Sequence, residues 1–306
     1  MTAAWIDGDI VPLERAGIPV GSAAARYGLN AFEGICGYRH ASADALLIFR
    51  LRDHAQRLVD SSRLLGLETD YGLPDFEDAV IACVRANDLR VDCQIRLTLF
   101  VVGEGNVATC GPVSLICTVA PRAERGLAER SLSAGISSWR RIDDTVMPPR
   151  AKVGANYLNG RYGLLDARAA NYDEAIFLTR EGKVAEATSA CLFMARRGRL
   201  VTPASTDSIL ESVTRDSLLH LAVALGLDVE ERAIDRSELM LADEIFLCGS
   251  AYEISPVTAL DGRPVGNGGA GPITTALWGL YERVVRGHAP GAYAEDWLRS
   301  IDAINS

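Results

Sequence analysis

The chain has 306 residues, 48% of them hydrophobic and 23% charged, which is typical of a globular protein with one large domain or two smaller ones. Its net charge of −9 and its lack of a basic run argue against nucleic acid or an anionic membrane as a partner. The first residues do not resemble a signal peptide, no apolar run is long enough to span a membrane, and the seven cysteines form no CxxC pair. We therefore expect a cytoplasmic protein with reduced thiols and no metal site.

The first part of the chain mixes strand and helix signals. An Asp-Gly turn at residues 7–8 predicts a hairpin, and Asp53 is suited to cap a helix that Gly66 ends. On that helix His54 and Arg57 are three residues apart and so share a face. The expected strands cover 4–11 (as a hairpin), 45–49, 94–102 and 113–119, and the expected helices cover part of 23–34, 53–65 and 75–87.

Residues 120–131, APRAERGLAERS, are polar and contain a proline and a glycine, so we expect them to connect two domains. The expected domains are a small α/β domain over residues 1–119 and a larger α+β domain with a barrel-like sheet over residues 132–306. In the second part the expected strands cover 133–139, 175–179, 183–186, 191–195, 200–202, 228–233 and 244–248, and the expected helices cover 156–170, 214–225 and 273–286.

Lys152 stands in the stretch MPPRAKVGANY, residues 147–157. The two prolines before it force an extended or turned backbone, and Gly154 after it lets another group approach closely. A lysine among small apolar residues is a candidate for a desolvated amine, which is the form that Schiff-base chemistry requires.

Three further motifs stand at fixed distances from this lysine. The motif AFEG occupies residues 31–34, KVAEATSACLF places Glu186 34 residues after Lys152, and ILESVTRDSLLH at 209–220 predicts a helix start able to attract an anion. Their order and spacing resemble the fold-type IV pyridoxal-phosphate enzymes, most closely the branched-chain aminotransferases, along nearly the full chain. The resemblance implies an α+β fold with a small first domain and a larger barrel-like second one, and pyridoxal 5'-phosphate as the cofactor.

The resemblance also implies roles for individual residues. Lys152 is similar to the Schiff-base lysine, Tyr157 to the tyrosine that bonds the cofactor's phenolic oxygen, and Glu186 to the carboxylate that pairs with the pyridine nitrogen. The expected phosphate ligands are Arg57, the helix start at Val213 and Thr214, and Ser250.

The residues expected to recognise the substrate depart from the family pattern. Cys36 stands where the family has an arginine, Gln94 where it has a tyrosine, and Arg122 where the branched-chain enzymes have a large aromatic residue. Because Gln94 and Arg122 replace aromatic residues and so remove apolar surface, we hypothesise a donor or acceptor with a polar or anionic side chain, and poor use of leucine and valine. The expected substrate-binding residues are Tyr27, Phe32, Gln94, Arg96, Arg122 and Ala251.

Together these residues predict an aminotransferase of amino-acid metabolism that moves an amino group between an amino acid and a 2-oxo acid and acts as a homodimer or higher homo-oligomer. Lys152 is also expected to act as the general base that moves the proton between the substrate Cα and the cofactor's C4′. Two enzyme alternatives stay open, a lyase of the aminodeoxychorismate lyase type and a D-amino acid aminotransferase. A cofactor-binding regulator without catalysis is the alternative from a different class.

Overall fold

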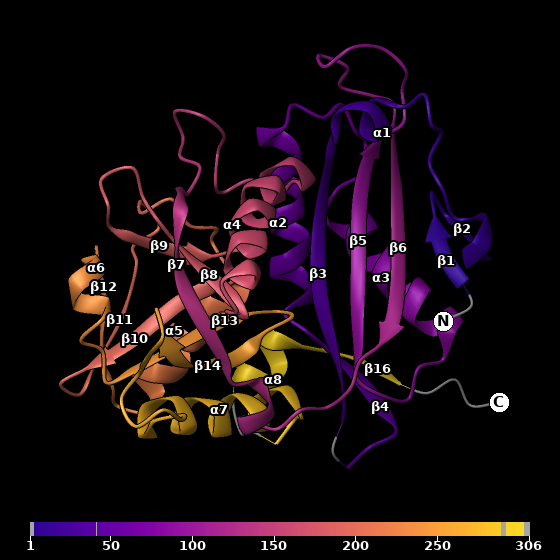
Figure 1. The fold of residues 1–306 in the computed structure, drawn as a ribbon. Helices are drawn as coiled ribbons and strands as arrows, with labels where there is room; N and C mark the ends of the chain where they lie inside the picture. The colour runs from indigo at the N-terminus through magenta and orange to yellow at the C-terminus, as the bar shows by residue number, and fades with distance from the viewer. Residues whose placement is uncertain (1–2, 41, 289–291, 303–306) are drawn as a thin grey trace. The chain divides into compact units, whose positions relative to one another are not determined.

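The computed structural model describes residues 3–40, 42–288 and 292–302 (Figure 1). Two compact units make up the described chain: the first contains residues up to 124, residues 151–155 and residues from 283 onward, and the second contains residues 125–150 and 156–282. Each unit combines helices with a sheet, which confirms the predicted α+β class. No helix within the described ranges is long and apolar enough to cross a membrane.

The first unit is built on an antiparallel sheet with the strand order β16-β4-β3-β5-β6-β1-β2. Helices α2 and α3 pack against it, and Leu58, Phe76 and Ile95 are fully buried in their shared apolar core. Burial of each such side chain stabilises the fold by about 1.5–3 kcal/mol. The strands are β1 (Ala3–Ile6), β2 (Asp9–Pro12), β3 (Asn30–Arg39), β4 (Ala45–Phe49), β5 (Cys93–Val101), β6 (Val113–Pro121) and β16 (Leu298–Asp302). The helices are η1 (Leu13–Arg15), α1 (Ala23–Tyr27), α2 (Leu51–Leu64), α3 (Leu73–Asn87) and α8 (Ala292–Trp297).

The second unit is built on a larger sheet with the strand order β12-β11-β10-β13-β14-β7-β8-β9. Strand β9 turns back into β10 through residues 188–190, where Ala187 N–H donates to Ala190 O at 2.8 Å, so the sheet curls back on itself. The strands are β7 (Leu132–Arg140), β8 (Glu174–Leu178), β9 (Val184–Ala187), β10 (Cys191–Arg196), β11 (Arg199–Thr202), β12 (Asp228–Glu231), β13 (Glu244–Gly249), β14 (Glu253–Leu260) and β15 (Arg263–Pro264). The helices are η2 (Ala128–Arg130), η3 (Gly154–Asn156), α4 (Tyr157–Ala169), α5 (Val213–Ala224), α6 (Arg236–Leu239) and α7 (Pro272–Val285), of which η3 and α7 cross the division between the units.

Most predicted elements are confirmed, but the predicted start of α2 is wrong. The helix begins at Leu51 after Arg50, whose φ is +49°, and Asp53 lies inside the first turn. There its carboxylate accepts a hydrogen bond from Arg50 Nε at 2.7 Å instead of capping the helix. The segment 23–34 is helical only in α1, and the AFEG motif lies in strand β3.

The division between the units also differs from the expected domain boundaries. It falls after residue 124, inside the predicted connection 120–131. Residues 151–155 and 283–306, however, belong to the first unit, although they were expected with the larger domain. Strand β16 shows the reason at the C-terminus, because it pairs with β4 along its whole length.

Candidate active site

The backbone around Lys152 is fixed to the first unit by hydrogen bonds. Phe32 N–H donates to Lys152 O at 3.0 Å, Val153 forms a bridge with Ala31, and Lys152 N–H donates to Ser61 Oγ at 3.0 Å. On β3, strand β4 pairs with residues 37–39. The segment around Lys152 lies along an earlier part of β3, near Ala31 and Phe32, which β4 does not reach. Lys152 Nζ lies 5.0 Å from the centre of the Phe32 ring.

The chain contains few lysines, so few side-chain amines could form a Schiff base. The sequence contains two lysines, Lys152 and Lys183. Lys183 is on the second unit, its side chain is 40% exposed, and its Nζ lies 2.6 Å from Asp235 Oδ1 in an ion pair. A solvated, paired surface amine is a poor nucleophile, so Lys152 is the better candidate for covalent chemistry.

One face of the first unit's sheet collects most of the predicted substrate residues. In the register of β3 and β5, Phe32 pairs with Thr98, Gly34 with Arg96, and Cys36 with Gln94. Because side chains alternate along a strand, these positions share a face, and the Arg96 guanidinium lies 3.3 Å from the centre of the Phe32 ring. Lys152 contacts the same ring, so Phe32 links the lysine to Arg96.

Cys36, Gln94 and Arg122, which the sequence analysis interprets as departures from the family pattern, form a cluster on this face. Arg122 Nη1 lies 2.9 Å from Cys36 Sγ, and the Cys36 thiol lies 3.9 Å from Gln94 Oε1. The Arg122 guanidinium also stands 5.6 Å from the centre of the Tyr38 ring. The substitutions therefore place a positive charge and an amide where three separate stretches of the chain meet.

Tyr27 lies apart from this cluster. It is the last residue of α1 and is 38% exposed, with the Arg26 guanidinium 5.3 Å from its ring centre. Within the described ranges, no hydrogen bond or ring contact joins Tyr27 to the other predicted substrate residues of the first unit.

Arg57 is oriented by a buried acid. Its Nε and Nη2 donate to the two oxygens of Glu33 at 2.8 and 2.7 Å, and His54 Nδ1 lies 2.7 Å from Glu33 Oε2. Burial alone raises the pKa of Glu33, but Arg57 and His54 outweigh it and hold that pKa well below its ordinary value. Burial, with smaller contributions from Arg57 and Lys152, lowers the pKa of His54 despite its contact with Glu33. Glu33 is thus ionised beside a neutral His54 whose Nδ1 carries the proton.

In the second unit Glu186 is held as a buried carboxylate. It is 4% exposed, and its Oε1 lies 2.6 Å from Arg141 Nη2. Its Oε2 accepts a hydrogen bond from Leu210 N–H at 3.1 Å and a weaker one from Cys191 Sγ at 3.6 Å. All these partners donate, an arrangement that suits a carboxylate, which only accepts hydrogen bonds. Glu186 is therefore not a solvated surface charge.

The remaining predicted cofactor residues stand at the ends of elements of the second unit. Tyr157 begins α4, and α5 begins at Val213 and Thr214, as expected for a helix start that attracts an anion. Ser212 Oγ caps α5 by accepting from Arg215 N–H at 3.3 Å. Ser250 and Ala251 occupy the turn between β13 and β14, and Ala251 also lines a surface pocket together with Arg125 and Tyr252.

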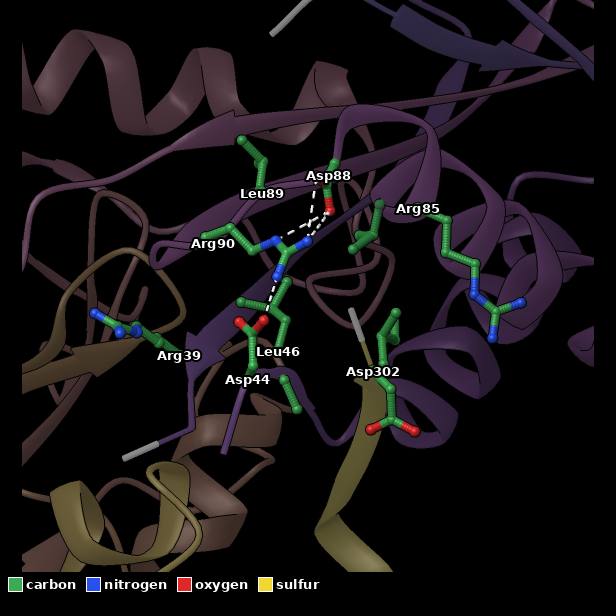
Figure 2. Close-up of a pocket in the computed structure, with 11 residues that line it drawn as sticks. Arg39, Asp44, Leu46, Arg85, Asp88, Leu89, Arg90 and Asp302 are labelled. Carbon is green, nitrogen blue, oxygen red and sulfur yellow. Dashed lines mark hydrogen bonds and ion pairs between the residues drawn. The ribbon is translucent and has the colours of Figure 1, made fainter. Parts of the chain in front are cut away.

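A pocket in the first unit is lined by residues other than the predicted cofactor and substrate residues (Figure 2). It is lined by apolar residues and by charged ones, among which Arg90 pairs with Asp44 and, at 3.1 Å, with Asp88. None of the predicted cofactor or substrate residues lines it, so it is not the candidate active site.

The residues present have the chemistry that pyridoxal phosphate requires. They supply one lysine on the sheet face, one buried carboxylate held ionised, an arginine and a capped helix N-terminus. Next to Glu186, Arg141 Nε is buried and has no hydrogen-bond partner among the described residues. A polar group of a ligand would relieve that unpaired donor.

Sequence reasoning did not find Glu33, His54 or Arg141 as members of the site. Glu33 is visible in the AFEG motif, and His54 and Arg57 share a helix face, so a charged network was within reach of the pattern. Arg141 has no such signal, because it follows Arg140 directly and nothing in the sequence distinguishes the buried arginine from its exposed neighbour.

Comparison with known proteins gives the family. The family model described as "Amino-transferase class IV" matches residues 32–260, which is most of the chain. A probable branched-chain-amino-acid aminotransferase of Aquifex aeolicus is 36% identical over 290 residues, covering 94% of this chain and 93% of the relative.

Solved structures agree with the sequence relatives. The branched-chain aminotransferase of Thermobaculum terrenum in its pyridoxal-phosphate form is 40% identical, covers 98% of each chain and superposes with a TM-score of 0.92. The branched-chain aminotransferase of Thermoproteus uzoniensis, solved with norvaline, is 36% identical, covers 98% of this chain and 99% of its own, and has a TM-score of 0.92. These matches confirm the fold-type IV architecture and pyridoxal phosphate as the cofactor. The chain belongs to the class IV aminotransferase family and is a pyridoxal-phosphate-dependent aminotransferase.

Proposed function

We propose that the enzyme transfers an amino group between an amino acid and a 2-oxo acid, with Lys152 as its catalytic residue. The observation that carries the proposal is the position of Lys152: it is one of two lysines, its backbone is fixed by β3 and α2, and its amine lies over Phe32. The relatives named as branched-chain aminotransferases support transfer between substrates of this kind.

Lys152 has two tasks in this proposal. Bound pyridoxal phosphate supplies an aldehyde that takes up amino groups and a ring that accepts electrons from the substrate Cα. Lys152 Nζ would hold the cofactor covalently until an amino acid displaces it, and the released amine would then act as the base that takes the proton from the substrate Cα. The second substrate, a 2-oxo acid, is aminated by the same steps in reverse.

The other predicted residues bind and orient. Glu186 keeps a proton on the pyridine nitrogen, and Tyr157 donates to the phenolic oxygen. The phosphate is bound by Arg57, the start of α5 at Val213 and Thr214, and Ser250. The ionised state of Glu186 and the orientation of Arg57 by Glu33 support these roles.

The substrate class follows from the cluster of Cys36, Gln94 and Arg122. An isobutyl side chain gains roughly 1.5–3 kcal/mol from apolar burial, and this cluster offers a guanidinium, a thiol and an amide instead. A polar side chain that hydrogen-bonds these groups compensates for the hydration that they lose when a substrate covers them, which is worth on the order of 1–3 kcal/mol per group. We therefore propose a donor or acceptor with a polar or anionic side chain, handled in cytoplasmic amino-acid metabolism.

A donor screen with 2-oxoglutarate as the common acceptor tests the function. New amino acids are expected, and the ratio of kcat/KM for glutamate or a polar analogue to that for leucine should exceed one. Arg122→Ala should lower that ratio, whereas Arg63→Ala, at an exposed arginine of α2, should leave it unchanged.

Three results of this screen would contradict the proposal. A preference for leucine that Arg122→Ala does not alter returns the enzyme to ordinary branched-chain specificity. Release of pyruvate from a chorismate-derived amine without transamination identifies a lyase. Exclusive use of D-amino acids identifies a D-amino acid aminotransferase.

A further inference from the structure

Arg141 forms a buried ion pair with Glu186, the carboxylate proposed above to face the cofactor. The side chains of the two residues are 8% and 5% exposed, and the Nη2–Oε1 distance is 2.6 Å. Hydrogen bonds from charged donors at this distance are among the strongest in proteins, and a partly desolvated pair responds strongly to the loss of either member.

Arg141 is itself held rigidly. Its backbone N–H donates to Leu178 O at 2.9 Å, and its Nη1 donates to Asn159 Oδ1 at 3.2 Å. Asn159 lies two residues after Tyr157 on α4, and its Nδ2 donates to Arg140 O at 3.0 Å. One asparagine thus connects the start of α4 to the end of β7 and fixes the guanidinium that contacts Glu186.

We propose that Arg141 is a positioning residue that keeps Glu186 ionised, so that the proton shared between Glu186 and the pyridine nitrogen rests on the nitrogen. The inference depends on the proposed pairing of Glu186 with that nitrogen. A shared proton has two places: on the nitrogen, facing a carboxylate, or on the carboxyl oxygen, facing a neutral ring. The guanidinium touches the carboxylate directly, so it stabilises the negative charge more than it opposes a positive charge beyond it.

The position of this proton determines how strongly the ring withdraws electrons from the substrate Cα. A protonated ring accepts electrons from the substrate Cα better than a neutral ring does. Without the guanidinium, a carboxylate that is nine-tenths buried favours its neutral form, and the proton moves from the nitrogen to Glu186. Arg141 therefore supports proton removal from Cα without contacting the substrate.

The test is nitrogen-15 NMR of the purified enzyme loaded with pyridoxal phosphate labelled at the ring nitrogen. The wild type should show the chemical shift of a protonated pyridine, and Arg141→Met should move the signal toward the neutral value. Removal of the substrate α-proton in single turnover should slow at least tenfold in Arg141→Met. The matched control is Arg140→Met, which removes the same charge from an exposed neighbour and should leave both the shift and the rate unchanged.

Further variants separate the possible failures. Arg141→Lys keeps the charge and should retain the protonated shift, whereas Arg141→Gln keeps hydrogen-bonding capacity without charge and should lose it. If Arg141→Met does not fold, the contrast between Lys and Gln decides the question. The inference would be overturned if Arg141→Met and Arg141→Gln both kept the protonated shift. If Arg141→Met cannot be measured, a protonated shift in Arg141→Gln is enough to overturn it. If Glu186→Gln also leaves the shift unchanged, the proposed pairing of Glu186 with the nitrogen fails as well, and the two failures are thereby distinguished.

Discussion

At the scale of single residues, contacts within the protein orient Arg57, the candidate phosphate ligand. Arg57 donates to both oxygens of Glu33, which is fully buried and also bonded by His54. A guanidinium held by two parallel hydrogen bonds has one orientation, so less conformational entropy is lost when an anion binds to it. The glutamate of the AFEG motif, Glu33, therefore holds the Arg57 guanidinium in place.

Replacing Arg57 should weaken cofactor binding specifically. A hydrogen bond to a charged group contributes about 1.5–3 kcal/mol, so Arg57→Ala is expected to raise the Kd for pyridoxal phosphate roughly 10- to 100-fold. Excess cofactor should restore part of the activity. Arg63→Ala removes an exposed arginine from the same helix and serves as the control, and absorbance titration of the apoprotein measures both. Unchanged affinity in Arg57→Ala would exclude Arg57 as a phosphate ligand.

His54 should give the protein a specific acid sensitivity. Its pKa is lowered in the folded state, chiefly by burial, so on acidification below about 6.5 the unfolded chain binds a proton that the folded chain does not. Wild-type stability should therefore fall between pH 7.5 and 5.5 by more than that of His54→Gln, measured as thermal midpoints of the apoprotein. His220→Gln, at an exposed histidine, is the control and should follow the wild type. A smaller acid loss in the wild type than in His54→Gln would mean that folded His54 is charged.

At the scale of elements, the sequence predicts best where the pattern is local. The helices α3, α5 and α7 begin and end within two residues of their predicted bounds, since apolar periodicity and end signals determine them. Strand β14 was not predicted, because Pro256 interrupts its pattern although its neighbours complete the sheet. Strand β16 was not predicted either, because its only reason to be a strand is pairing with β4, about 250 residues earlier in the chain.

Helix α4 depends on a close approach to the turn after β9. A Cβ added at Gly160 would lie 2.4 Å from Thr188 O, which is a backbone atom and cannot move aside cheaply. Gly160→Ala should therefore destabilise the protein by about 1–3 kcal/mol despite the better helix propensity of alanine. Gly279→Ala in α7, where the added Cβ meets nothing within 4 Å, should leave the thermal midpoint unchanged or raise it. Equal midpoints for the two variants would show that α4 does not need the close contact.

At the scale of the whole molecule, the sequence points more directly to the residues proposed to bear the chemistry than to the residues that contact and orient them. Lys152, Glu186 and Arg57 stand in motifs whose spacing along the chain can be read directly. Arg141 and Glu33 act through contacts that only the folded chain creates, between strand ends and helices distant in sequence. The contact between Cys36 and Arg122, which are 86 positions apart in the chain, is likewise created only by folding.

We propose that the active enzyme is a homodimer in which Tyr27 serves the active site of the partner subunit. Tyr27 is exposed at the end of α1, apart from the sheet-face cluster of its own chain. Inactive Tyr27→Ala and inactive Lys152→Ala should then regain activity when mixed, because a mixed dimer contains one intact site. Gel filtration and native mass spectrometry confirm the exchange of subunits. Failure to regain activity after confirmed exchange would argue that each site is built from one chain.

The central claim is that Lys152 carries the cofactor, and borohydride reduction followed by peptide mapping tests it most directly. The purified yellow enzyme is reduced and digested with trypsin, and the position of the reduced cofactor is read by mass spectrometry. Because a modified lysine resists cleavage, the label should appear on one peptide, residues 151–161, bounded by Arg150 and Arg161. Lys183→Arg should label like the wild type, and Lys152→Ala should not be labelled although it still binds the cofactor noncovalently. A stable label on Lys183 or on the N-terminal amine, retained in Lys152→Ala, would contradict the account.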